Sequence, residues 1–174
     1  MEPKAIVYTS NTGFTAQYAK LLEKRTGLRA YALQDAPDTL NKETPVIYMG
    51  WIMAGKIQGL ITAAKRYPVA AVCGVGMNPT GSQLAVVRQV NGLGEATPVF
   101  TLQGGLNMDK LHGFKKLVLK SMGGTIGRQL MAKPERTPDE EAILEMFRNG
   151  GDHVSMQNLK EVLAWYEQIS GRKV

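Results

Sequence analysis

Short apolar segments alternate with amphipathic ones along most of the chain, and this alternation limits the fold more than any other feature. Each apolar segment is short and rich in Val, Ile, Ala or Tyr, which is typical of a buried β-strand. The segments between them have apolar residues at the three- and four-residue spacing of a helix. Alternation of this kind predicts an α/β fold, in which a parallel sheet has helices on both faces.

Five strands and four main helices account for most of the 174 residues, which we interpret as a single domain, 1–174. The expected strands are Ala5–Thr9, Arg29–Ala32, Val46–Gly50, Val69–Gly74 and Val99–Leu102. The expected helices are Gly13–Thr26, Gly55–Tyr67, Ser82–Val90 and Met156–Ser170. Ser155 precedes the last helix and is its expected N-cap.

An insertion at about 104–150 separates the fifth strand from the last helix and is too long for a simple connection. Two helices are expected in it, at Asp109–Met122 and Pro138–Asn149, with a loop at 123–134 between them. Thr137 is the expected N-cap of the second helix, because a proline and three acids follow it directly. The insertion is therefore predicted to be helical.

The composition favours a cytoplasmic protein. No apolar run reaches the roughly 18–20 residues that span a bilayer, and the first residues lead straight into a strand without a signal-peptide pattern. The single cysteine, Cys73, cannot form an internal disulfide and is expected to be a small buried residue. With two histidines far apart and one cysteine, we expect no metal site.

The net charge of +6 points to an acidic partner or surface. Basic residues gather without any acid in one part of the insertion, at Lys110, Lys115, Lys116, Lys120, Arg128 and Lys133. They form either a solvated helix face or a peripheral contact, through 109–133, with an anionic membrane or an acidic partner. Aromatic residues suited to stacking on bases are missing from this helix, so nucleic acid is not an expected partner.

The first predicted strand runs into a turn that is rich in uncharged hydrogen-bond donors. The turn consists of Ser10, Asn11, Thr12, Gly13, Phe14 and Thr15. In an open parallel sheet such a turn lies at the carboxyl edge, where ligands bind, and the following helix turns its positive end toward it. Hydroxyl, amide and backbone N–H donors there form a phosphate site, although a plain Ser/Thr-rich N-cap is the alternative.

Two common phosphate motifs do not fit this turn: no lysine follows Gly13, and there is only one glycine. The turn instead resembles the phosphate loop of the flavodoxin family, [ST]-x-T-G-x-T. The resemblance implies a flavodoxin-like three-layer sandwich with strand order 2-1-3-4-5. It also implies that FMN is the cofactor, with its phosphate in this turn.

The same resemblance implies that two later loops hold the flavin ring. The loop after the third strand contributes Gly50, Trp51, Ile52, Met53, Ala54 and Gly55. The loop after the fourth strand contributes Gly74, Val75, Gly76, Met77 and Asn78. Trp51 is either a stacking partner of the ring or an ordinary core tryptophan.

Residues 103–111 narrow the resemblance to one type of flavodoxin-domain protein. QGGLNMDKL and the basic segment after it resemble the corresponding region of flavodoxin-domain proteins of the HemG type, which are protoporphyrinogen dehydrogenases. The basic residue and the aromatic of that motif are replaced by Gly105 and Met108, and the motif before the last helix is reduced to 151–155. These departures bear on the identity of the substrate more than on the binding of the flavin.

Two functions follow as expectations. One is an FMN-dependent oxidoreductase that acts on a small-molecule substrate, and the alternative is an electron carrier between redox partner proteins. The charge favours the enzyme, because flavodoxin carriers tend to be acidic. The segments 50–57, 74–82 and 103–108 contain no Asp or Glu that would disfavour a reduced, anionic flavin. No catalytic acid or base is expected, because the cofactor carries the redox chemistry.

Overall fold

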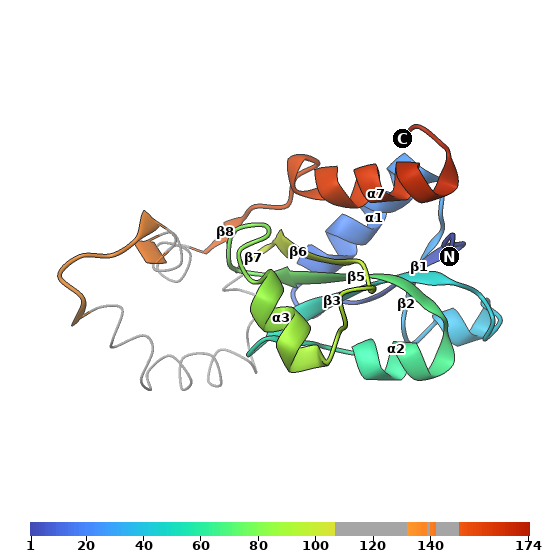
Figure 1. The fold of residues 1–174 in the computed structure, drawn as a ribbon, viewed down its shortest axis with the longest axis horizontal. Coiled ribbons are helices and arrows are strands. Elements are labelled where there is room, and N and C mark those ends of the chain that lie inside the picture. The colour runs from blue at the N-terminus through green and yellow to red at the C-terminus, as the bar shows by residue number, and fades with distance from the viewer. Residues whose placement is uncertain (107–131, 139, 142–149) are drawn as a thin grey trace.

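The computed structural model describes residues 1–106, 132–138, 140–141 and 150–174. In this part of the chain the main sheet has six strands. They are β1 (Ala5–Thr9), β2 (Ala30–Ala32), β3 (Val46–Met53), β4 (Lys56–Ile57), β5 (Val69–Gly76) and β6 (Val99–Gln103). The order across the sheet is β2-β1-β3-β5-β6, and β4 pairs with β3 off this path. Figure 1 shows the strands of this path between the helices.

The sheet is mostly parallel, as the alternation of strands and helices predicts. The pairs β1–β2, β1–β3, β3–β5 and β5–β6 are all parallel, whereas β4 is antiparallel to β3. The expected count of five strands was therefore wrong. A sixth strand forms because the chain turns back after Met53 and pairs Ile57 with Ile52.

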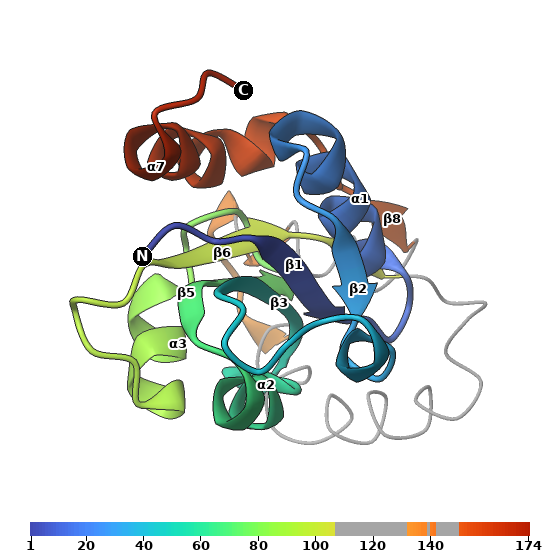
Figure 2. The same ribbon diagram turned by 90° about the vertical axis from the view of Figure 1, so that its right-hand side faces the viewer.

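Helices cover both faces of the sheet. Figure 2 shows α1 (Phe14–Thr26) and α7 (Lys160–Ser170) on one face, and α2 (Leu60–Arg66) and α3 (Leu84–Asn91) on the other. Two short 3-10 helices complete this part of the fold, η1 (Ala36–Asp38) and η3 (Gln157–Leu159). The result is a three-layer α/β fold.

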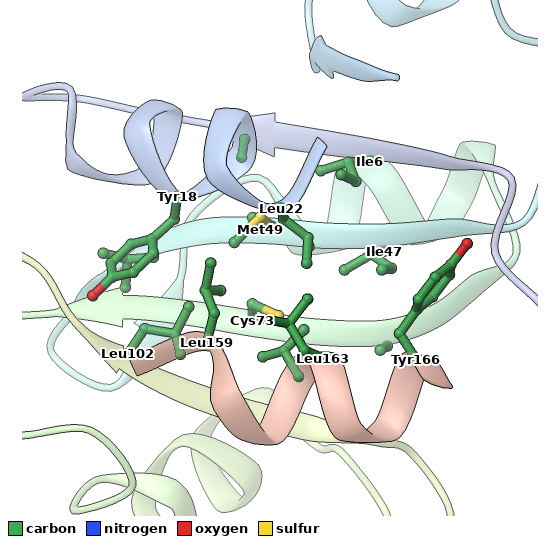
Figure 3. Close-up of a cluster of buried hydrophobic side chains, with 14 of the residues drawn as sticks. Ile6, Tyr18, Leu22, Ile47, Met49, Cys73, Leu102, Leu159, Leu163 and Tyr166 are labelled. Atoms are coloured by element: carbon green, nitrogen blue, oxygen red, sulfur yellow. The ribbon is translucent and has the colours of Figure 1, made fainter. Parts of the chain in front are cut away.

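Each face of the sheet buries its own apolar cluster. On the α1 and α7 side, Ile6, Leu22, Ile47 and Tyr166 are fully buried between sheet and helices (Figure 3). On the opposite side, Val87 of α3 is equally buried. A fully buried aliphatic or aromatic side chain contributes about 1.5–3 kcal/mol, so the helices are held by their apolar stripes.

One helix boundary differs strongly from the prediction. A helix was expected over Gly55–Tyr67, but α2 begins only at Leu60. The residues before it form a tight turn, in which Ala54 and Gly55 both have positive φ angles (49° and 79°), and then strand β4. Two positive φ angles at a two-residue turn are the requirement of a type I′ hairpin, and this local geometry overrides the helical pattern.

The N-cap expected at Thr137 is confirmed, whereas the one expected at Ser155 is not. The expected helix Met156–Ser170 is divided into η3 and α7, whose N-caps are Met156 and Leu159. The Ser155 hydroxyl still accepts a hydrogen bond from the Asn158 N–H at 3.3 Å, within η3. Thr137 and Glu140 form a reciprocal capping box, with distances of 3.0 and 3.2 Å.

The ends of the insertion are described, and most of it is not. Two short strands, β7 (Gly105–Leu106) and β8 (Gly151–Asp152), pair antiparallel where it leaves and rejoins the domain. The predicted helix at 109–122, most of the helix at 138–149 and most of the basic segment 109–133 lie outside the described residues. Of the basic residues in that segment, Lys133 is described, and it forms an ion pair with Glu140 at 2.6 Å.

Candidate functional site

The carboxyl ends of β1 and β3 lie side by side in the centre of the sheet. Their register pairs Thr9 with Gly50, and β5 and β6 continue this row through Gly74 and Thr101. The chain leaves β1 toward α1 on one face, and it continues from β3 to α2 on the other face (Figure 2). A crevice at such a reversal of strand order is where open α/β sheets bind ligands.

The turn from β1 to α1 exposes backbone donors at this edge. Gly13 has φ = 104°, a left-handed conformation that a side chain would strain, and α1 begins directly after it at Phe14. The first intrahelical bond runs from the Gln17 N–H to the Gly13 carbonyl at 3.0 Å. The amides of Phe14 and Thr15 therefore precede the helical ladder, and no described residue accepts their hydrogen bonds.

Side-chain hydroxyls surround these amides. Thr15 is only 1% exposed, and its hydroxyl makes no hydrogen bond to any described residue. Thr12 is half-buried and Asn11 is exposed, both in the turn itself. The Ser10 Oγ accepts a long hydrogen bond, 3.3 Å, from the Ala16 N–H. The structure thus brings the predicted loop residues together around the positive end of α1.

The segment after β3 is strand rather than loop. Trp51, Ile52 and Met53 were expected in a loop, but they extend β3 and pair with β5 and β4. Trp51 is half-buried, while Met53 and Ala54 are exposed at the tip of the hairpin. The prediction failed because Gly50 was interpreted as the end of the strand.

The glycines in this region are covered by the protein itself. A Cβ on Gly50 would come within 2.6 Å of both the Gln58 carbonyl oxygen and the Ile57 side chain. A Cβ on Gly55 would lie 3.2 Å from Val90 of α3. Gly50 and Gly55 therefore admit the returning hairpin and α3, which is a packing role.

The segment after β5 is also shorter than expected. Val75 and Gly76 belong to the strand, and Met77 and Asn78 are the half-buried residues that follow it. Cβ atoms on Gly74 and Gly76 would come within 2.9 Å and 3.3 Å of the Ile52 side chain. Met77 and Asn78 lie at the edge of the sheet, whereas Gly74 is buried beneath Ile52.

A hydrogen-bond network that the sequence did not indicate closes the α1 side of this edge. The Tyr18 hydroxyl donates to the Gln103 carbonyl and accepts from the Asn158 amide, whose nitrogen is 2.7 Å away. Asn158 also donates to the His153 carbonyl at 2.8 Å, and the His153 N–H donates to the Gly104 carbonyl at 2.9 Å. Burial is the largest cause of the raised pKa of Tyr18. The network ties the ends of β6 and β8 to α1.

One carboxylate reaches the first turns of α1. The Asp152 Oδ2 accepts a hydrogen bond from the Gln17 amide at 3.2 Å, and its Oδ1 accepts from the Val154 N–H at 2.9 Å. A negative charge near a helix N-terminus is favourable for the helix. The same charge would repel a phosphate bound at that terminus. Asp152 therefore stabilises the helix and disfavours a bound anion.

A second network holds the opposite side of the edge. The fully buried Tyr48 donates to the Gln58 carbonyl at 2.6 Å, and its oxygen lies 2.8 Å from the Thr9 hydroxyl. Burial raises the pKa of Tyr48 to about 12. Because Thr9 precedes the phosphate-type turn and Gln58 follows β4, Tyr48 fixes the hairpin relative to that turn.

The remaining candidate groups play no part at this edge. Cys73 is fully buried, as predicted, and burial raises the pKa of its thiol to about 12. Within the described ranges there is no group of three or more His, Cys, Asp or Glu side chains able to hold a metal ion. No helix in this part of the chain is long and apolar enough to cross a bilayer.

Comparison of the chain with protein-family models, with curated proteins and with solved structures finds no match. Any function assigned to the chain therefore depends on its own residues and on their arrangement.

Proposed function

We propose that the protein binds FMN and acts as a flavodoxin-like oxidoreductase. The observation that carries this proposal is the turn between β1 and α1. It combines two backbone amides without acceptors among the described residues with the hydroxyl of Thr15, a buried residue whose side chain makes no hydrogen bond to a described residue. Unpaired donors at the positive end of a helix favour an anion, and a phosphate can accept from all of them.

The order of the strands supports the same proposal. When the antiparallel β4 is set aside, the remaining strands follow one another as second, first, third, fourth and fifth in the chain. Flavodoxin-like sheets have this order and bind FMN at the reversal between the first and third strands. The turn containing Ser10 and Gly13 lies at that reversal.

The phosphate end of FMN fits these residues better than the ring end does. Thr12, Thr15 and the amides of α1 would hold the phosphate. Near the ring, the backbones of Gly50 and Gly74 are occupied by neighbouring side chains, so they would give little contact. The ring would instead lie against the half-buried Trp51, Met77 and Asn78 at the edge of the sheet.

Bound FMN would supply the transfer of electrons or hydride, and the chain would bind and orient it. The positive net charge of +6 favours an enzyme over a flavodoxin-type carrier, since carriers of that kind tend to be acidic. The resemblance to HemG-type proteins makes protoporphyrinogen the first substrate to assay. Electron transfer that requires a partner protein, with no oxidation of small molecules, would support the carrier alternative.

Titration of the purified protein with FMN and with riboflavin tests the proposal directly. Riboflavin has the same ring and lacks the phosphate, so it is the matched control ligand. We expect FMN to bind at least roughly a hundredfold more tightly, because the loss of several charge-assisted hydrogen bonds costs more than 3 kcal/mol. Equal affinity for the two ligands, or no binding of either, would overturn the proposal.

A further inference from the structure

An apolar groove lies on the face of the sheet opposite the phosphate-type turn, between α2 and α3. It contains a cavity of about 470 Å³ that is open to solvent. Ile61 of α2 and Val90 of α3 form its walls, and Ile57, Val69 and Val72 contribute from β4 and β5. Figures 1 and 2 both show α2 and α3 side by side under the sheet, away from α1 and α7.

The exposed apolar side chains of the described residues concentrate beside this groove. Ile61 is 74% exposed, Val86 is 53% exposed and Val90 is 40% exposed, and Met53 at the hairpin tip is 38% exposed. Met1 is the single other large apolar residue of comparable exposure in the described part of the chain. Such a concentration of apolar surface on one face is typical of an interaction site.

Hydrogen bonds hold the walls of the groove in place before any partner binds. The Asn91 amide donates to the Gly55 and Val87 carbonyls at 2.8 and 2.7 Å, and its oxygen accepts from the Ile57 N–H at 3.0 Å. Asn91 therefore holds α3 against the β4 hairpin, and the oxygen and nitrogen of its side-chain amide both have hydrogen-bond partners there. A preformed groove costs little conformational entropy on binding.

Basic residues lie on β4, α2 and α3 beside the groove. Lys56 lines it, Lys65 lies one turn after Ile61 on α2, and neither forms an ion pair with a described residue. Arg66 and Arg88 lie in the last turns of α2 and α3. The sequence contains no Asp or Glu between Glu43 and Glu95, and Glu95 is exposed in the loop between the lining residues Leu93 and Thr97. The acidic η1 segment lies on the far side of α2 from the groove, as Figures 1 and 2 show.

We propose that this groove is the docking site for an acidic amphipathic helix of a partner protein. Helices of seven and eight residues, such as α2 and α3, are about 10–12 Å long. A docked helix with apolar anchors at positions i, i+3 or i+4, and i+7 spans about 10.5 Å, which matches the length of the groove. Carboxylates beside those anchors would face Lys56 and Lys65.

The charge and the shape of the groove disfavour two other occupants. A second copy of the chain in a two-fold arrangement would bring Lys56 and Lys65 of both copies together, and their like charges would repel. A bilayer surface is flat on this scale and would leave the recessed cavity uncovered.

Three synthetic helical peptides test the proposal by fluorescence anisotropy. They share one apolar stripe and carry Glu, Gln or Lys beside it. We expect the Glu peptide to bind most tightly and the Lys peptide least tightly, with a difference that shrinks at high salt. Replacing Ile61 and Val90 by Gln should weaken all three by roughly tenfold or more.

Charge reversal separates specific docking from general stickiness. Lys56→Glu with Lys65→Glu should invert the order of the peptides, while Lys24→Glu on the exposed surface of α1 should leave the order unchanged. All of these side chains are exposed, so circular dichroism should show folded variants. An unchanged order in the Lys56/Lys65 variant overturns the proposal. Dimerisation of the protein, or binding to vesicles containing phosphatidylserine, overturns it equally if Ile61→Gln removes that behaviour and the peptides do not bind.

Discussion

Replacing Thr15 by valine should weaken FMN binding without weakening the fold. Valine has nearly the same shape and lacks the hydroxyl, so the packing around this 1% exposed side chain is kept. A hydrogen bond to a charged phosphate contributes about 1.5–3 kcal/mol. The dissociation constant for FMN should therefore rise about ten- to hundredfold, and that for riboflavin should not change.

The free energy of unfolding of the ligand-free protein should respond differently. Without ligand, the Thr15 hydroxyl has no hydrogen-bond partner among the described residues, so its removal breaks no hydrogen bond to this part of the apoprotein. Deleting such a group is neutral or stabilising, by about 1 kcal/mol at most. A mutation that lowers ligand affinity and leaves or raises apo stability marks a binding residue.

Thr26 on the same helix is the matched control. Its hydroxyl donates to the Leu22 carbonyl at 2.7 Å and accepts from the Leu28 N–H at 3.2 Å, and the residue is buried. Thr26→Val should therefore lower the free energy of unfolding by about 1–3 kcal/mol and leave FMN affinity unchanged.

Urea denaturation of the apo variants and fluorescence titration with FMN measure both quantities. If Thr15→Val destabilises the apoprotein as Thr26→Val does, and FMN affinity stays at the wild-type value, Thr15 is an ordinary structural residue. The phosphate assignment would then be refuted.

Three further predictions concern other buried or charged groups. Tyr48→Phe should lower the free energy of unfolding at pH 7 by about 1–3 kcal/mol, because the Gln58 carbonyl loses its donor. Burial raises the pKa of Tyr48 to about 12 in the folded protein, above the pKa near 10 of the unfolded chain. The protonated tyrosine therefore contributes fully to the free energy of unfolding below about pH 10, and this contribution is lost as the pH rises toward 12. The Tyr48→Phe variant should lack this part of the alkaline decline in stability. Cys73, with a buried thiol and a pKa raised to about 12, should resist a disulfide reagent at pH 8 in the native protein and react at once in urea. Asp152→Asn should raise FMN affinity about two- to fivefold at low salt, because like charges repel and, by Coulomb's law in water, a carboxylate costs a phosphate dianion about 0.8 kcal/mol if the two are about 10 Å apart. An equal gain in riboflavin affinity would contradict this electrostatic account.

The sequence predicted the elements whose evidence is local. The apolar strands and the stripe of α1 place the core without any knowledge of contacts, since periodicity alone decides which face is buried. The turn at Ser10–Thr15 was predicted from local residues as well, because its uncharged donors stand directly between an apolar strand and a helical pattern. The positive φ of Gly13 is a finding of the structure. The burial of Cys73 was predicted from its apolar neighbours.

Gly50 shows why β3 and β4 were misassigned. A glycine after a run of apolar residues usually ends a strand, yet here it lies within one, because any side chain would collide with Gln58 and Ile57 of the returning chain. The signal was present in the next residues. Ala54 and Gly55 stand between Ile52 and Ile57, the spacing of a two-residue hairpin. A glycine can mark a close approach of two segments as well as an end, and only the partner segment distinguishes these roles.

The network around Tyr18 illustrates what no local pattern contains. Tyr18 and Asn158 are separated by 140 positions, and their hydrogen bond exists only because β8 and η3 return to the end of β6. A tyrosine on the apolar stripe of a helix predicts burial, but burial alone does not say where its hydroxyl finds a partner. The donors at the candidate site come from one short segment, while the groups that hold this segment in place, Tyr18 and Tyr48, depend on distant residues. A substitution at Asn158 should therefore act on ligand binding only through the position of α1, whereas a substitution at Thr15 acts on the bond itself.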